Sequence, residues 1–346
     1  MNERKLYLDY IRILAILLVL FNHLPGYYQY SQVNQNEVYI WIYLLITMIT
    51  RVNVPLFLMV SGALLLCKND SLEKWCGRIL RILFVLFSLS VLMYVLCCVK
   101  KSQLINMFDF LYNFLGGKID YLDSYWFLYA YLGMLCALPL LRYISQKMSK
   151  TDVIVLISLK FIFTSVIPVL NFILIYYEIT PIVISGNYQL PFIGIKEMFY
   201  PLIGFYIYEH RPSSKTKLKC GLCAIIGIFT ESLLTYLQGI TSCFTQDYVQ
   251  LFDYILAIFI FIMIQDTVKL YKRWGTKYII LLSNLTFGIY LFDPFLKFLG
   301  GEQLIDYLCN HIPNIFSSFI WIVMSIIIGG MFTYILKKNY FLSKIL

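Results

Sequence analysis

A series of long apolar runs limits the fold of this chain more than any other feature of its sequence. Several runs are long enough to form the helix of about 20 residues that crosses the hydrocarbon core of a bilayer. Hydrophobic residues make up 60% of the chain and charged residues 14%, whereas soluble domains carry about 25% charged residues. The sequence therefore predicts an all-α integral membrane protein.

Ten membrane-spanning helices can be placed on these runs. One of them, segment 38–67, is too long for a straight crossing, and Pro55, which lacks an amide donor, predicts a kink near Asn53. No stretch is polar enough to form a separate globular unit, so residues 1–346 are expected to form one transmembrane domain. The predicted spans are 6–28, 38–67, 78–99, 124–142, 152–175, 191–208, 219–239, 249–268, 278–299 and 313–336.

Basic residues alternate from loop to loop along this arrangement. Loops rich in Lys and Arg face the cytoplasm, and both termini and every second loop hold most of the 28 Lys and Arg. The opposite loops hold only Lys100, Lys101, Lys118 and Lys297. We therefore expect both termini to lie in the cytoplasm. This topology accounts for the net charge of +9, so no nucleic-acid partner is needed to explain that charge.

The first predicted helix carries ionisable side chains within the membrane. Such groups are costly in lipid and are candidates for function. Arg12 and His23 are separated by just over three full helical turns, so they share one face about 16 Å apart. Because the N-terminus is predicted to be inside, Arg12 lies in the cytoplasmic half and His23 in the outer half. The alternative is a structural Arg12 paired with Asp9.

Several segments resemble membrane-bound acyltransferase family three. The helix LDYIRILAILLVLFNH (8–23) is similar to the opening helix of that family, which is marked by an Arg, ten residues and a His. Arg78 and Arg81 match its RxxR signature at the start of the third helix. Asp293 stands where many members have a His. The other matching segments, in order along the chain, are NVPLFLMVSGALLL (53–66), SYWFLYAYLGMLCALPLL (124–141) and SNLTFGIYLFDPF (283–295).

The resemblance implies an enzyme in a multi-pass arrangement in the bacterial cytoplasmic membrane. Its donor would be acyl-CoA, with acetyl-CoA the leading form, and no metal is implied. Its acceptor would be a hydroxyl of a cell-surface polysaccharide or of a lipid-linked glycan precursor in the cell envelope. The extracytoplasmic hydrolase-like domain that is fused to some members is expected to be absent.

The resemblance implies that arginines bind the phosphates of the donor. Planar guanidinium groups suit phosphate, so Arg12, Arg78 and Arg81 are predicted to hold the nucleotide end of acyl-CoA. The alternative for Arg78 and Arg81 is ordinary cytoplasmic loop charge. Arg51, beside the predicted kink, either lines the donor channel or pairs with Glu231.

The acid–base chemistry is assigned to His23, because an imidazole can accept a proton from a hydroxyl near neutral pH. Asp253 and Asp293 are predicted either to orient His23 or to bind sugar hydroxyls. The alternative is that both carboxylates sit at water-facing helix ends. Lys160 is expected to extend its flexible side chain to the cytoplasmic surface.

Two other classes of function fit a chain with many helices. Buried charges are also found in a transporter of a small solute or a glycan lipid, although the halves show no repeat. A membrane sensor for a partner protein is the third possibility. Cys220 and Cys223 have CxxC spacing, but no second pair follows, so a metal site is not expected. The acceptor sugar, the oligomeric state (including a homodimer) and the choice between direct transfer and an acyl-protein intermediate stay open.

Overall fold

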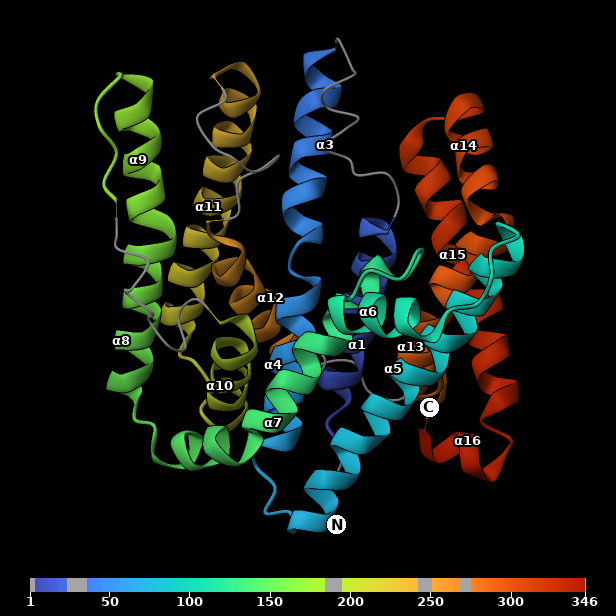
Figure 1. Cartoon of the computed structure of the whole chain (residues 1–346). Helices are drawn as coiled ribbons and strands as arrows, with labels where there is room; N and C mark the ends of the chain where they lie inside the picture. The colour runs from blue at the N-terminus through green and yellow to red at the C-terminus, as the bar shows by residue number, and fades with distance from the viewer. Residues whose placement is uncertain (1–3, 24–35, 184–194, 242–250, 268–274, 346) are drawn as a thin grey trace. The chain divides into compact units, whose positions relative to one another are not determined.

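The computed structural model describes residues 4–23, 36–183, 195–241, 251–267 and 275–345 (Figure 1). These residues form helices and connecting loops, with no strand among them. The all-α class is therefore confirmed over the part of the chain that is described.

The helices follow one another with short connections. Two π-helical turns, Ile162–Val166 and Lys297–Gly301, and a 3-10 turn, Asp123–Tyr125, lie among them. The α-helices are α1 (Leu6–Asn22), α3 (Glu37–Thr50), α4 (Asn53–Leu65), α5 (Leu72–Lys100), α6 (Met107–Gly116), α7 (Trp126–Lys147), α8 (Lys150–Phe161), α9 (Ile167–Tyr176), α10 (Lys196–Glu209), α11 (Ser214–Thr241), α12 (Asp253–Thr267), α13 (Thr276–Leu296), α14 (Glu302–His311), α15 (Asn314–Leu336) and α16 (Tyr340–Ile345).

Seven helical segments within the described residues are long and apolar enough to cross a membrane. They comprise α3 with α4, α5, α7, α8 with α9, α11, α13 with α14, and α15. The three remaining predicted spans contain α1, α10 and α12, whose helical lengths are 17, 14 and 15 residues. A multi-pass membrane protein is therefore confirmed, while the count of ten and the cytoplasmic termini remain predictions.

Prolines interrupt two of the long helical segments. α3 ends at Thr50 and α4 begins at Asn53, which confirms the predicted kink. Pro55 has no N–H to donate to the carbonyl of Arg51, so one hydrogen bond of a continuous helix is missing at this break. In the same way, Pro168 follows the π-helical turn that joins α8 to α9.

The fold divides into two compact units, each built from two segments of the chain. Unit 1 comprises Met1–Cys67 and Pro139–Thr276, and unit 2 comprises Lys68–Leu138 and Lys277–Leu346. Each unit therefore depends on contacts between residues far apart in the sequence.

In unit 1, α4 and α10 lie side by side at backbone contact distance (Figure 1). A Cβ placed on Gly62 would lie 2.0 Å from the carbonyl oxygen of Pro201, and one on Gly204 would lie 2.2 Å from that of Met59. Only glycine permits this approach on both sides. α1 packs against α3, α4 and α12, while α11 packs against α3 and α12.

In unit 2, two short helices accompany the spans and were not expected from hydropathy. α6 packs on α5, and α14 packs on α15. Asn106 caps the start of α6 by accepting from two backbone amides, and Gly117, with φ of 62°, ends it in the left-handed conformation. Because α6 has ten residues, it is too short to register as a span of about 20 residues.

Candidate functional site

The predicted cytoplasmic end of α1 holds an ion-pair network around Asp9. Arg4 donates to both carboxylate oxygens of Asp9 at 2.8 Å, and this hydrogen bonding raises the pKa of the Arg4 guanidinium. The nearest nitrogen of Arg12 lies 3.8 Å from Asp9. Arg4 is therefore the closer partner of Asp9, and the pairing of Arg12 with Asp9, given above as the alternative, is a weaker contact.

The other end of α1 carries His23. The backbone N–H of His23 donates to the carbonyl of Val19 at 3.0 Å, so the helical register continues through this residue. The regular helix supports the predicted common face of Arg12 and His23. Asn22 donates to the carbonyl of Thr50 at 3.1 Å, which brings the chain at His23 to the kink beside Arg51.

Asp253, at the start of α12, lies in a buried polar cluster of unit 1. The hydroxyl of Tyr200 donates to its carboxylate at 3.3 Å. Lys160 is 6% exposed, and its Nζ lies 4.9 Å from the ring centroid of Phe199 and 5.4 Å from that of Tyr254. The expectation that Lys160 reaches the cytoplasmic surface is therefore wrong. Cation–π contacts and the nearby carboxylate stabilise its charge away from water.

Glu231 of α11 contacts the backbone just before α12, the helix that carries Asp253. Its carboxylate accepts from the backbone amides of Leu251, at 2.6 Å, and Phe252. These amides precede the first turn of α12, where unsatisfied N–H groups and the helix dipole favour an anion. The structure therefore gives Glu231 a capping role at the helix that presents Asp253.

Asp293, the second predicted acid, lies in unit 2 with no exposed surface. Ser325 of α15 donates to its carboxylate at 2.9 Å. Tyr125 donates to the carbonyl of Leu291 at 2.6 Å, and Tyr290 donates to that of Ser124 at 2.6 Å. The alternative of water-facing helix ends is therefore wrong for Asp293. It is also wrong for Asp253, which is 8% exposed.

The two arginines of the RxxR segment lie on α5 in different surroundings. Arg78 forms an ion pair with Asp70, and its side chain is 26% exposed. Arg81 is exposed on the same helix. The carboxylate of Asp70 therefore offsets the charge of Arg78. The sequence alone does not reveal this partner.

The predicted site residues thus divide between the two units. Arg12, His23, Arg51 and Asp253 belong to unit 1, whereas Arg78, Arg81 and Asp293 belong to unit 2. Sequence reasoning missed the roles of Lys160 and Tyr200 beside Asp253. The sequence does show that Lys160 lies in the middle of an apolar run. It does not show in which direction the side chain extends. Among the described residues, no group of three or more His, Cys, Asp or Glu could hold a metal ion.

Comparison with known proteins identifies the family of the chain. No curated protein and no solved structure matches the chain. The acyltransferase 3 family, described as an acyltransferase domain, matches residues 5–342, nearly the whole chain. The helices that carry the Arg12–His23 and Arg78–Arg81 motifs both lie within that match. The chain therefore belongs to the acyltransferase 3 family and is a multi-pass membrane acyltransferase.

Proposed function

We propose that the protein is an O-acyltransferase that moves an acyl group, most simply acetyl, from cytoplasmic acyl-CoA to a carbohydrate hydroxyl. The acceptor is a cell-surface polysaccharide or its lipid-linked precursor, and the enzyme resides in the bacterial cytoplasmic membrane. The observation that carries this proposal is the geometry of α1, where one regular helix holds Arg12 and His23 about 16 Å apart on a common face.

His23 supplies the general base in this proposal. Its imidazole takes the proton of the acceptor hydroxyl as that oxygen attacks the thioester carbonyl. The carbon–sulfur bond then breaks, and the departing thiolate receives the proton from His23. The products are an ester and free coenzyme A, so protons and electrons balance. If transfer passes instead through an acyl-protein intermediate, the acceptor hydroxyl needs the same base in the second step.

Four arginines supply positive charge for the polyanionic donor. Arg12 lies on the helix of His23, and Arg51 lies at the kink that contacts the end of that helix. Arg78 and Arg81 lie on α5 at the predicted cytoplasmic boundary. A guanidinium group can bind two phosphate oxygens at once through two N–H groups, and it stays charged in partly buried positions. The donor would therefore be held by guanidinium–phosphate contacts.

The buried carboxylates are assigned supporting roles. Asp253 accepts a hydrogen bond from Tyr200, whose ring is fully buried. That environment favours a part in orienting the site over direct contact with a sugar. Asp293, held by Ser325, occupies the position where many family members carry His, and is assigned to orientation of the base or to a sugar hydroxyl.

Replacement of the base tests the proposal. Purified protein in liposomes, supplied with radiolabelled acetyl-CoA and a glycan acceptor, should lose about 10²–10⁴-fold in kcat/KM in the His23→Ala variant. His311→Ala is the matched control, because His311 is exposed and contacts Tyr307 of its own helix. Near-normal transfer by His23→Ala would exclude the role of His23 as base.

Surface-glycan mass spectrometry identifies the acceptor. Cells that carry the active protein should show ester groups that are missing in matched cells with His23→Ala. Identical ester content in every envelope glycan would contradict the proposed carbohydrate acceptor. The purified enzyme would then be screened with other hydroxyl compounds.

A further inference from the structure

A polar cavity of about 230 Å³ opens within unit 1. It lies where the start of α1 meets the ends of α10 and α12, away from His23 and from the cluster around Lys160. The positive-inside rule places this end of the unit in the cytoplasm. The residues that line the cavity are Lys5, Tyr7, Tyr208, Glu209, Arg211 and Gln265.

Gln265 is the central feature of this cavity. Gln265 is 2% exposed, and within the described part of the chain its amide nitrogen makes two long contacts, 3.3 Å to the carbonyl of Ile207 and 3.5 Å to the hydroxyl of Tyr7. Its side-chain carbonyl oxygen has no hydrogen-bond partner among the described residues. A buried acceptor without a partner costs about 1–3 kcal/mol, so a ligand N–H or O–H would stabilise this site.

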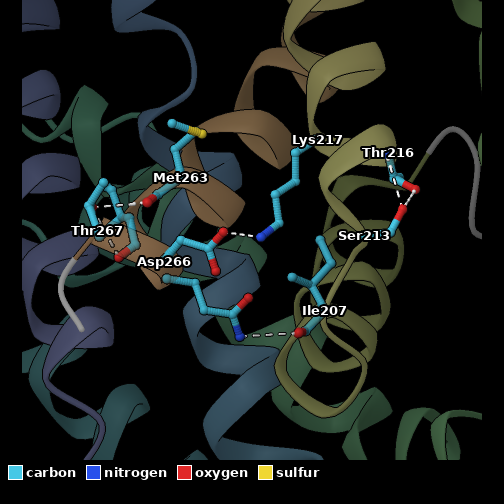
Figure 2. A network of polar contacts seen from close by, with 9 residues as sticks. Ile207, Ser213, Thr216, Lys217, Met263, Asp266 and Thr267 are labelled. Carbon is cyan, nitrogen blue, oxygen red and sulfur yellow. Dashed lines mark hydrogen bonds and ion pairs between the residues drawn. The ribbon is translucent and has the colours of Figure 1, made fainter. Parts of the chain in front are cut away.

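The walls of the cavity are held in place by neighbouring contacts. Lys217 of α11 forms an ion pair with Asp266, the residue after Gln265 (Figure 2). The ring of Tyr7 packs edge-on against that of Phe261, with centroids 6.1 Å apart. The cavity is therefore bordered by residues whose positions depend on contacts between separate helices.

The chemistry of the lining favours a phosphorylated purine. The side-chain carbonyl oxygen of Gln265 can accept from the 6-amino group of adenine, while its amide N–H groups contact Ile207 and Tyr7. Tyr7 and Tyr208 also line the cavity, and aromatic side chains are the groups on which a base stacks. Lys5 and Arg211 are exposed at the rim, where they can meet phosphate groups in water.

The size of the cavity limits it to one part of a ligand. Small-molecule pockets usually measure about 300–1,000 Å³, so 230 Å³ suits a base but not an entire coenzyme. Tyr7 and His23 lie on the same helix, about 24 Å apart by helical rise. A molecule that occupies both places needs a nucleotide end and a long flexible arm, which are the two parts of coenzyme A.

We infer that this cavity binds the adenine of the acyl-CoA donor through Gln265, with the nucleotide phosphates held at its rim by Lys5 and Arg211. This inference rests on the proposed function for the identity of the donor. It adds Gln265, Lys5 and Arg211 to the four arginines that are proposed to bind the donor.

Binding of adenosine 3′,5′-bisphosphate, the nucleotide end of the coenzyme, tests the inference without acyl transfer. Calorimetry on protein in nanodiscs should show binding that Arg211→Ala weakens about fivefold or more. Lys215→Ala is the matched control, because Lys215 is exposed in the same stretch but does not line the cavity. Equal binding by wild type and Arg211→Ala, or no binding by the wild type, would overturn the inference.

A pair of ligands isolates the contact of Gln265. A purine riboside bisphosphate without the 6-amino group should bind the wild type about threefold to tenfold more weakly than the adenosine compound. Gln265→Leu should bind both compounds equally, and normal thermal unfolding will show that it is folded. A preference for adenine that survives in Gln265→Leu would contradict the assignment.

Lipid binding and failure of the proposed function give distinct results. If native mass spectrometry shows phosphatidylglycerol retained through Arg211 while the nucleotide does not bind, the cavity is a lipid headgroup site and the inference falls. If the nucleotide binds through Gln265 but no acyl transfer occurs, the inference stands and the proposed reaction falls. If acyl transfer occurs and Arg211→Ala leaves the KM for acetyl-CoA unchanged, the proposed reaction stands and the inference falls.

Discussion

At the scale of single residues, the charges inside this membrane protein are compensated locally. Asp9 is bound by Arg4, Lys160 lies against aromatic rings, and Glu231 receives backbone amides. Each arrangement reduces the cost of placing an ionic group in a low dielectric. Charge within a span therefore identifies a residue of interest, but its partners decide between a structural and a chemical role.

Arg78 allows these two roles to be separated. If Arg78 binds donor phosphates, Arg78→Ala should raise the KM for acetyl-CoA severalfold, whereas Asp70→Asn should lower it by releasing the guanidinium from its ion pair. Steady-state kinetics in liposomes measures both values. If the ion pair is only structural, both variants should lower the unfolding temperature and leave the KM unchanged.

Lys160 and Asp253 should show coupled effects on stability. Asp253→Asn leaves the buried cation without its neighbouring carboxylate, which should destabilise the protein by on the order of a few kcal/mol. Addition of Lys160→Met removes that cation and should restore part of the loss. Thermal unfolding in detergent measures each variant, with Lys215→Met as the exposed control. Strictly additive effects would show that the two charges do not interact.

At the scale of elements, close backbone contact and helix interruption shape the units. α4 and α10 meet through Gly62 and Gly204, and Pro55 and Pro168 follow breaks in long helical segments. Side chains would hold α4 and α10 farther apart. The close contact places α10 against α4, which begins at the kink. The end of α10 also forms one wall of the polar cavity.

The glycines of this contact should be sensitive to the smallest substitution. Gly62→Ala and Gly204→Ala place a methyl group against backbone atoms, so each should lower stability by about 1–3 kcal/mol or more. Gly77→Ala is the matched helical control, since nothing lies within 4 Å of its Cβ position. It should be neutral or slightly stabilising. The stability of the three variants is compared by unfolding in detergent. Equal stability of all three would show that the close contact between α4 and α10 does not make Gly62 and Gly204 sensitive to substitution.

At the scale of the whole molecule, the sequence predicts that the chain crosses the membrane ten times. Seven described helical segments qualify as spans by length and composition, and α1, α10 and α12 are shorter. With all ten crossing, the alternation of basic loops places residue 118 outside and residues 213 and 339 inside.

Labelling from one side of the membrane tests this topology. In a cysteine-free background, Lys118→Cys should react in intact spheroplasts with a maleimide that cannot cross membranes. Ser213→Cys and Asn339→Cys should react only after permeabilisation, because the positive-inside arrangement places both in the cytoplasm. Reaction of Ser213→Cys in intact spheroplasts would refute the predicted arrangement of ten spans.

Much of the architecture is already present in the sequence. Runs of apolar residues specify membrane helices because an unpaired backbone cannot remain in lipid, and Pro55 located the break between α3 and α4. The spacing of Arg12 and His23 specifies a shared face through helical periodicity alone. The short helix α6 escaped this reasoning because ten residues do not span a bilayer.

What only the tertiary structure decided is which side chains meet. Lys160 extends under the rings of Phe199 and Tyr254, and Gln265 lines a cavity with residues from the start of α1 and the end of α10. Helical periodicity is a local property of the backbone, so the sequence by itself determines helices and their faces. Contacts between distant helices depend on packing of complementary surfaces, so the partners of a buried charge or amide follow only from the folded chain.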